Sequence, residues 1–425
     1  MPTDASSVAA AARSLGAALC GLLLLAGCGT TPAAPPAPEA LPMRVSDAPK
    51  PPRTAQPLDE AVLSLTVALL DRARLEPPGP SGRHDLVVDP LIDRATGQQT
   101  AVTRGMEQRI GTLVRARYPA FNLRPFGTAA LDDQPLILLG AITPVAEAGV
   151  IPASEAPFPQ VYRIWAVLGD LRTGRIVSHE TAWVRGPDVD MTPTAFFRDS
   201  PAWNREPLTA AYLRTCAGDP GEAIDPAYLR ALRAQAHAAD GVRAYEAGNP
   251  AAALAAYEAA SALPGGDQLR VRNGLYLANK ALGRDAAAEA AFGAVVAQGL
   301  DRGELAVKFL FRPGTTAFWA DPAISGDYPM WLRQIARQTE PRPFCLALTG
   351  HASPTGPAAL NRRLSAARAE AVRGRLVAER PALRPRTVAE GVGASQPLIG
   401  TGTDDATDAL DRRVSFAPEA CAARL

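Results

Sequence analysis

The chain has 425 residues, enough for two or three domains, and its formal net charge at neutral pH is +1. This balance gives no reason to expect a nucleic-acid partner, because nucleic-acid binding needs a concentrated basic surface. Aromatic residues make up only 6% of the sequence, so ordinary cores of Val, Leu and Ile are expected.

The first 27 residues have the pattern of a bacterial signal peptide. An apolar run over 15–26, too short to span a membrane as a mature helix, ends in Leu25-Ala26-Gly27-Cys28. This ending resembles the lipobox of bacterial lipoproteins, and the resemblance implies cleavage before Cys28 and its acylation, palmitate included. Gly29 follows the cysteine, which by the family's sorting rule implies the outer membrane, facing the periplasm. An ordinary secretory signal is the alternative.

Residues 28–57 combine the lipidated cysteine with a linker rich in proline and alanine. Such a segment favours extended polyproline-like conformations and could reach on the order of 90 Å. It is interpreted as a stalk.

Residues 58–200 predict an α+β domain. The expected order is helix, strand, helix, two strands and a hairpin, at 58–75, 86–88, 103–116, 121–126, 135–145 and 161–184. This layout resembles the CsgG/FlgO/LpoB-like lipoprotein domains, whose members act by binding partners. Asp89 and Asp93 have a spacing that suits a divalent cation, but an Asp-Pro turn with local capping is the preferred interpretation, and no metal site is predicted.

Residues 201–304 predict alanine-rich helices in two copies of one pattern. Ala253 and Tyr257 recur as Ala288 and Phe292, about 35 residues later. The period and the small–aromatic pairing resemble tetratricopeptide repeats. The region is therefore either a groove for a protein partner or a helical spacer.

Residues 305–425 predict a compact βαβαββ two-layer sandwich, whose second helix is expected over 358–379. The landmarks are Gly350-His351-Ala352-Ser353, Gly356, Asn361, Leu364-Ser365, Arg368-Ala369, Gly391-Val392-Gly393 and Asp411-Arg412-Arg413-Val414. In this order they resemble the OmpA-like C-terminal domain, which binds peptidoglycan non-covalently through the diaminopimelate of the stem peptide. The whole chain is thus predicted to be an α+β multidomain protein with a helical middle.

The predicted peptidoglycan-binding residues are Ser353, Asn361, Ser365, Arg368 and Arg412. At 100° per residue, Leu360, Leu364, Ala367 and Ala371 form one helical stripe that is expected to face the sheet. Asn361, Ser365 and Arg368 then lie at its edge and point toward the turn at 351–356. Arginine suits a carboxylate because its planar fork donates two parallel hydrogen bonds.

The turn departs from the family pattern, which has Thr-Asp where this chain has Ala352-Ser353. Losing one charge-assisted hydrogen bond costs about 1.5–3 kcal/mol, or roughly ten- to a hundredfold in affinity. Weak binding, replacement by Asp404, Asp405, Asp408 or Asp411, and a degenerate site all remain open, with weakened binding preferred.

The mature chain has three cysteines besides Cys28, so at most one intramolecular disulfide can form. Cys345 opens one predicted strand and Cys421 follows the last one. These ends meet if the strands are antiparallel neighbours, and a Cys345–Cys421 disulfide is predicted. A Cys216–Cys421 pair and three free thiols are the alternatives.

No catalytic motif or cofactor-binding loop is recognised, so no enzymatic activity and no cofactor is expected. The first hypothesis is an outer-membrane lipoprotein that links or senses the cell wall through peptidoglycan. The alternative is a periplasmic scaffold or activator that binds an envelope protein, such as a cell-wall synthase or a secretion component, through residues 58–304.

Overall fold

The computed structural model describes residues 55–78, 81–145, 161–312, 314–398 and 411–421, which all belong to one compact unit. Within these ranges, no helix is both long and apolar enough to cross a membrane.

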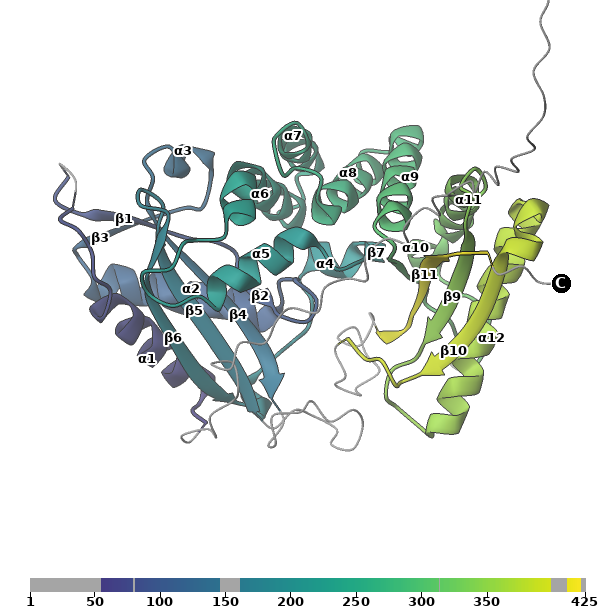
Figure 1. The fold of residues 1–425 in the computed structure, drawn as a ribbon, viewed down its shortest axis with the longest axis horizontal. Coiled ribbons are helices and arrows are strands. Elements are labelled where there is room, and N and C mark those ends of the chain that lie inside the picture. Colours follow the sequence, from purple (N-terminus) through teal and green to yellow (C-terminus); the bar gives the residue numbers. More distant parts are fainter. Residues whose placement is uncertain (1–54, 79–80, 146–160, 313, 399–410, 422–425) are drawn as a thin grey trace, which may run out of the picture. The chain divides into compact units, whose positions relative to one another are not determined.

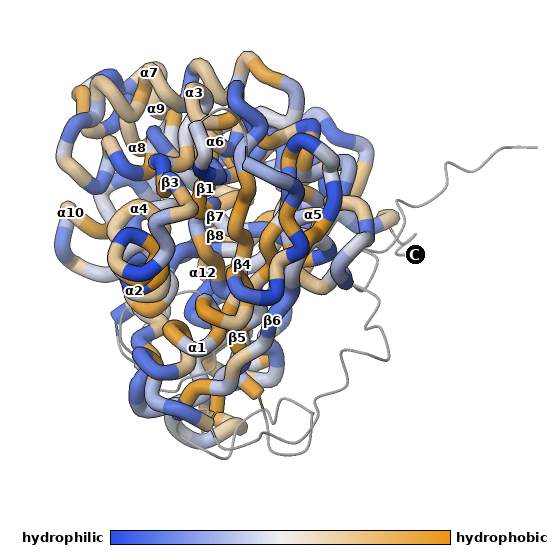
Figure 2. The backbone as a smooth tube through the Cα atoms, turned by 90° about the vertical axis from the view of Figure 1, so that its left-hand side faces the viewer, coloured by the Kyte–Doolittle hydropathy of each residue, from blue (hydrophilic) through white to orange (hydrophobic). Residues whose placement is uncertain are grey.

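The N-terminal part is built on a six-stranded mixed sheet (Figure 1). Its strands are β1 (His84–Val88), β2 (Ile92–Asp93), β3 (Phe121–Arg124), β4 (Leu136–Val145), β5 (Val161–Asp170) and β6 (Arg175–Arg185). The order is β3-β1-β4-β5-β6, with β1 parallel to β3 and β4, and with β2 parallel to β4. Strands β4, β5 and β6 are antiparallel. The hydrophobic run along β4 (Figure 2) fits a central strand that is covered on both faces.

Helices cover both faces of this sheet. One face packs against α1 (Leu58–Asp71) and α2 (Ala101–Arg117). Helix α1 ends four residues before the expected end, whereas α2 begins two residues early because Thr100 and Thr103 form a capping box. Short α3 (Thr128–Leu131) and α4 (Ala195–Asp199) were not predicted.

The opposite face packs against α5 (Pro207–Cys216) and α6 (Pro226–Glu246), through Tyr212 and Tyr228 among others. The predicted boundary at residue 200 is therefore not a boundary of packing. Composition changes there, but the second apolar face of the sheet still has to be buried, and the first helices of the next segment bury it.

The middle of the chain contains two consecutive helical hairpins. They are formed by α6 with α7 (Pro250–Ser261) and by α8 (Leu269–Ala281) with α9 (Asp285–Asp301). Gly248 and Gly283 hold the equivalent turns with φ of 71° and 68°, conformations that favour glycine. The predicted repeat positions Ala253, Tyr257, Ala288 and Phe292 are all buried, so the two copies share one local structure.

The C-terminal part is a five-stranded sheet in the order β10-β9-β11-β8-β7. Its strands are β7 (Ala202–Trp203), β8 (Leu305–Lys308), β9 (Cys345–His351), β10 (Thr387–Gly393) and β11 (Arg413–Glu419). Between them lie α10 (Pro322–Ser325), α11 (Tyr328–Thr339) and α12 (Ala358–Glu379), the last with the bounds expected from the sequence. Apart from β7 and α10, this is the predicted βαβαββ order.

The helical hairpins and the C-terminal sheet share one hydrophobic core. Phe292 of α9 stacks on Trp331 of α11, with ring centroids 5.4 Å apart, and Trp331 Nε1 donates to Tyr276 Oη at 3.0 Å. Strand β7 also pairs with β8, although it comes from the segment expected to be helical. The C-terminal sandwich is thus completed by residues that precede it in the sequence.

Candidate functional site

The turn that follows β9 is held in one conformation by the start of α12. Asn361 Nδ2 donates to the carbonyl oxygens of Ser353 at 3.3 Å and of Thr355 at 2.8 Å. The Ser353 and Thr355 hydroxyls lie 3.1 Å apart, within hydrogen-bond distance. Gly356 has a φ of 82°, which explains the glycine at this turn. The 351–356 turn is therefore preformed.

The face of α12 that packs on the sheet is not the one predicted. Leu360 is 49% exposed and Ala367 is exposed, whereas Asn361, Ser365 and Arg368 are buried. The predicted apolar stripe is wrong at its N-terminal end.

The physical reason is a very close approach of helix and sheet. A Cβ atom placed on Gly350 would lie 2.1 Å from the carbonyl oxygen of Ser365, and one on Gly391 would lie 2.1 Å from the backbone nitrogen of Ala366. Leucine does not fit there, and a small serine does. Ser365 Oγ accepts a hydrogen bond from the Gly393 amide at 2.9 Å, so its polar group is satisfied.

Arg368 binds a different segment from the one expected. Its Nε donates to the carbonyl oxygen of Thr315 at 3.1 Å, and its Nη2 approaches that of Arg312 at 3.4 Å. The guanidinium also lies over the Phe311 ring, 4.9 Å from the centroid. The arginine is 7% exposed. Its hydrogen bonds hold the segment after β8, whereas those of Asn361 hold the 351–356 turn.

His351 links two strands beside the turn. Its Nε2 lies 2.8 Å from Ser415 Oγ on β11, and burial lowers its pKa to about 3, with a further contribution from Arg413. The imidazole is therefore neutral at physiological pH. This supports a structural role for His351.

The structure does not place the four aspartates considered as substitutes for the missing acid together at the turn. Asp404, Asp405 and Asp408 lie outside the described residues. Asp411 is fully buried, and its Oδ1 accepts from the Leu398 amide at 2.6 Å. Arg412, a predicted site residue, is half-buried and directly precedes β11.

Sequence reasoning missed the groups that surround the arginine. Phe311 and the carbonyl groups of Arg312 and Thr315 come from a segment about 55 residues before Arg368. Backbone carbonyls carry no residue signature, so only the aromatic Phe311 could have hinted at a cation partner.

A disulfide joins Cys345 to Cys421, across a sequence separation of 76 residues. It lies at the end of the antiparallel β9–β11 pair, where Glu419 faces Cys345. Cys216 is a buried free thiol, so it does not pair with Cys421.

Asp93 near the N-terminal sheet has the capping role that was preferred over metal binding. Its Oδ2 accepts from the backbone amide and the hydroxyl of Thr96, at 2.9 and 2.6 Å. Asp89 accepts from Tyr228 Oη at 2.5 Å, and burial raises its pKa to about 7. Over the described ranges, no group of three or more His, Cys, Asp or Glu side chains could hold a metal ion.

Comparison with known proteins finds similarity in solved structures. No family profile and none of the curated proteins matches the sequence. The peptidoglycan-associated lipoprotein from Burkholderia pseudomallei is similar, with 24% identity over 27% of this chain and 89% of that chain, and a TM-score of 0.23. The cell wall anchor of the T6SS from Pseudomonas aeruginosa has 24% identity over 28% of this chain and 80% of that chain, with a TM-score of 0.23. The OmpA-like domain of FopA1 from Francisella tularensis has 15% identity over 27% of this chain and 75% of that chain, with a TM-score of 0.21.

Proposed function

We propose that the chain is an envelope lipoprotein that binds peptidoglycan non-covalently through residues 305–425. One observation carries the proposal. Asn361 and Arg368 lie on the same buried face of α12. Asn361 holds the preformed turn, and Arg368 places a guanidinium on the same side of the helix. These are the positions where the sequence resembles the OmpA-like ligand site. No catalytic step and no cofactor is part of the proposal.

The proposed ligand is the diaminopimelate group of the stem peptide, a zwitterion. Its carboxylate would be bound by Arg368, and its ammonium by oxygen acceptors of the turn that include Ser353. Two features are expected to weaken this binding. The turn contributes a hydroxyl where the family has a carboxylate, and Arg368 would have to exchange a backbone hydrogen bond for the ligand.

The proposal places the chain at the outer membrane through acylation of Cys28. Its support is the Leu25-Ala26-Gly27-Cys28 ending, and these residues lie outside the described ranges. The proline-rich linker would then carry the folded part toward the cell wall. Labelling of the full chain with a palmitate analogue, lost in Cys28→Ser, tests the anchor.

The decisive experiment is co-sedimentation of the chain from residue 29 onward with insoluble peptidoglycan. The helical segment is retained because β7 and α9 complete the C-terminal core. Wild type is expected to pellet weakly, Arg368→Ala to stay in solution, and Ser353→Asp to bind roughly ten- to a hundredfold more tightly. Arg363→Ala is the matched control, because Arg363 is exposed on the same helix.

The two variants separate binding from folding. Arg368→Ala also frees the segment after β8, so its melting temperature is measured alongside. Ser353→Asp keeps Arg368 and its structural hydrogen bonds, so this variant should remain folded and bind peptidoglycan more tightly. If neither wild type nor Ser353→Asp sediments with peptidoglycan, the cell-wall function is refuted.

A second function, as scaffold or activator of an envelope protein, is favoured by the tandem helical hairpins α6–α9. Consecutive hairpins expose a repeated surface that suits an extended protein segment. Photo-crosslinking groups at exposed positions Ala251 on α7 and Ala286 on α9 test this idea in living cells. A discrete adduct with one envelope protein is expected, and its absence at both positions argues against a partner on these helices.

A further inference from the structure

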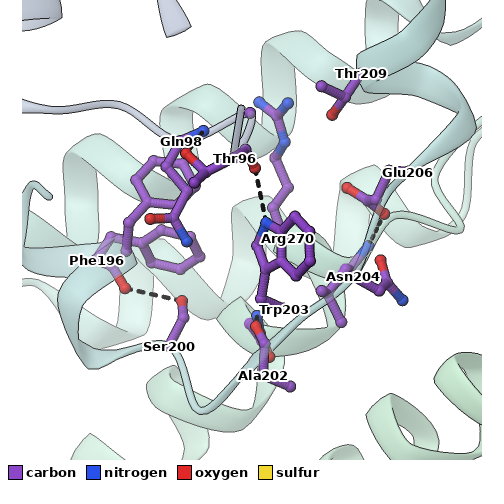
Figure 3. A pocket seen from close by; sticks show the side chains of 14 residues that line it. Thr96, Gln98, Phe196, Ser200, Ala202, Trp203, Asn204, Glu206, Thr209 and Arg270 are labelled. Atoms are coloured by element: carbon purple, nitrogen blue, oxygen red, sulfur yellow. Dashed lines mark hydrogen bonds between the residues drawn. The ribbon is translucent and has the colours of Figure 1, made fainter. Parts of the chain in front are cut away.

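A pocket lies far from α12 in the sequence, where the segment after β2 meets β7 and the start of α8 (Figure 3). Figure 3 shows Trp203 and Arg270 in the middle of the lining, with Thr96 and Gln98 on one side and Asn204 and Glu206 on the other. The pocket is partly open to solvent, and its volume of about 30 Å³ is space for about two water-sized groups.

Hydrogen bonds and close packing join the segments that form the pocket wall. Trp203 Nε1 donates to the carbonyl oxygen of Thr96 at 2.9 Å, which ties β7 to the segment after β2. Gly97 has a φ of 70°, and a Cβ atom there would lie 2.8 Å from the Thr209 side chain. Asn273 Nδ2 donates to the carbonyl oxygen of Ala202 at 2.9 Å.

Several buried polar groups in the lining have no protein partner. Asn204 is 3% exposed, and neither of its amide atoms has a hydrogen bond. Asn273 is also 3% exposed, and its Oδ1 has no hydrogen bond. Buried amides are normally satisfied, so unpaired ones beside a cavity indicate an occupant.

The charge balance of the pocket favours an anion. Arg270 is in the first turn of α8, where a cation is disfavoured by the helix dipole, and among the described residues it has no ion pair or hydrogen bond. Glu206 also lines the pocket, but its carboxylate already accepts from the Leu269 amide and pairs with Arg302 at 3.3 Å. The buried carboxyl of Asp89 also interacts electrostatically with Arg270. Because the pKa of Asp89 is raised to about 7, this carboxyl is partly protonated near neutral pH.

The place in the fold agrees with ligand binding. The segment that contains Thr96 and Gln98 follows the carboxyl end of β2, which is parallel to β4. In sheets with parallel strands, ligands bind beyond these carboxyl ends. The pocket also lies where three segments of the chain meet, a common location for small-molecule sites.

We propose that this pocket binds a carboxylate group, held by the Arg270 guanidinium with the Gln98 and Asn204 amides as further donors. The planar fork of arginine matches the two oxygens of a carboxylate, and the volume of the pocket fits two such oxygens but not the four of a phosphate. The carboxylate belongs either to a free small acid or to the C-terminus of a peptide.

Isothermal titration of the full chain with acetate tests the site, with sodium chloride at equal ionic strength as the blank. Saturable binding is expected for wild type, and Arg270→Gln should weaken it roughly tenfold or more. Arg284→Gln, which removes an exposed arginine just before α9, should leave it unchanged. Asn204→Leu should also weaken binding, and unchanged melting temperatures would show that each variant is folded.

Further arms identify the source of the carboxylate. Acetyl-Ala-Ala binding more tightly than acetate, with no binding of its carboxamide, assigns the site to a peptide C-terminus. Acetate binding without the dipeptide assigns it to a small acid. The proposal is overturned if acetate gives no saturable heat, if Arg270→Gln binds it as wild type does, or if inorganic phosphate binds more tightly than acetate.

Discussion

The buried carboxyl of Asp89 is expected to make the stability of the protein depend on pH. Asp89 is 2% exposed at the end of β1, and its Oδ2 accepts a hydrogen bond from Tyr228 on α6. Burial raises its pKa from 3.8 to about 7, although the Tyr228 hydrogen bond and Arg270 act in the opposite direction. Replacement by asparagine keeps the shape and the acceptor for Tyr228 but removes the ionisation.

The size of the effect follows from the two pKa values. Below pH 3.8 the carboxyl is protonated in both the folded and the unfolded protein, so ionisation costs nothing. As the pH rises toward about 7, the unfolded chain releases its proton while the folded protein retains it, and stability falls. At about 1.4 kcal/mol per pKa unit, Asp89→Asn should be more stable than wild type by about 2 kcal/mol at pH 5 and about 4 kcal/mol at pH 8.

Urea unfolding at pH 5, 6, 7 and 8 measures this difference as a change in the free energy of unfolding. The exposed acid Asp285 provides the control, and Asp285→Asn should show no such trend. If the gain from Asp89→Asn were equal at every pH, burial of the ionised carboxyl would not be its cause. A loss of stability at pH 8 would show that the carboxylate is favourably bound.

The other predictions concern packing and crosslinking. Gly274→Ala should destabilise the helical hairpins by about 1–3 kcal/mol, because the new Cβ atom would lie 2.4 Å from the Tyr257 ring. Gly374→Ala, at a helical glycine with open space around it, should instead be neutral or stabilise the protein by up to about 1 kcal/mol, and urea unfolding compares the two. Reduction of the Cys345–Cys421 disulfide should cost about 4 kcal/mol, given the 76-residue separation. The reducing agent should leave the unfolding midpoint of the Cys345→Ser/Cys421→Ser double variant unchanged, and a shift there would contradict the assignment.

Much of the fold could be predicted because its elements have strong local patterns. The apolar runs of β4 and β5 and the helix at 358–379 all occur near their expected positions. The two-residue strand β7 could not be predicted, because Ala202 and Trp203 form a strand only by pairing with β8, about a hundred residues later. The domain boundary at residue 200 was also not predictable, because it depends on which apolar face of the sheet α5 and α6 cover.

The structure brings the predicted residues Asn361, Ser365 and Arg368 together on one buried face of α12, but the orientation of this helix differs from the prediction. Helical periodicity placed Leu360 toward the sheet, because a period of 3.6 residues assigns apolar side chains to the buried face. Glycines at 350 and 391 reverse this assignment locally, since they let the helix backbone come closer than leucine permits. The glycines were visible in the sequence, but their position opposite Ser365 depends on the register between strand and helix.

This close contact has a consequence for how the site can change. Residues 350, 365 and 391 must stay small for α12 to reach the sheet, so the position of the turn and of Arg368 is set by packing rather than by a ligand. The close contact between α12 and the sheet does not depend on an acid at position 353, because Ser353 lies in the turn, where its hydroxyl is near that of Thr355 and its carbonyl oxygen accepts from Asn361. The scaffold of the site can therefore persist without the acid, and we expect Ser353→Asp alone, without a second substitution, to recover tight binding of a zwitterion.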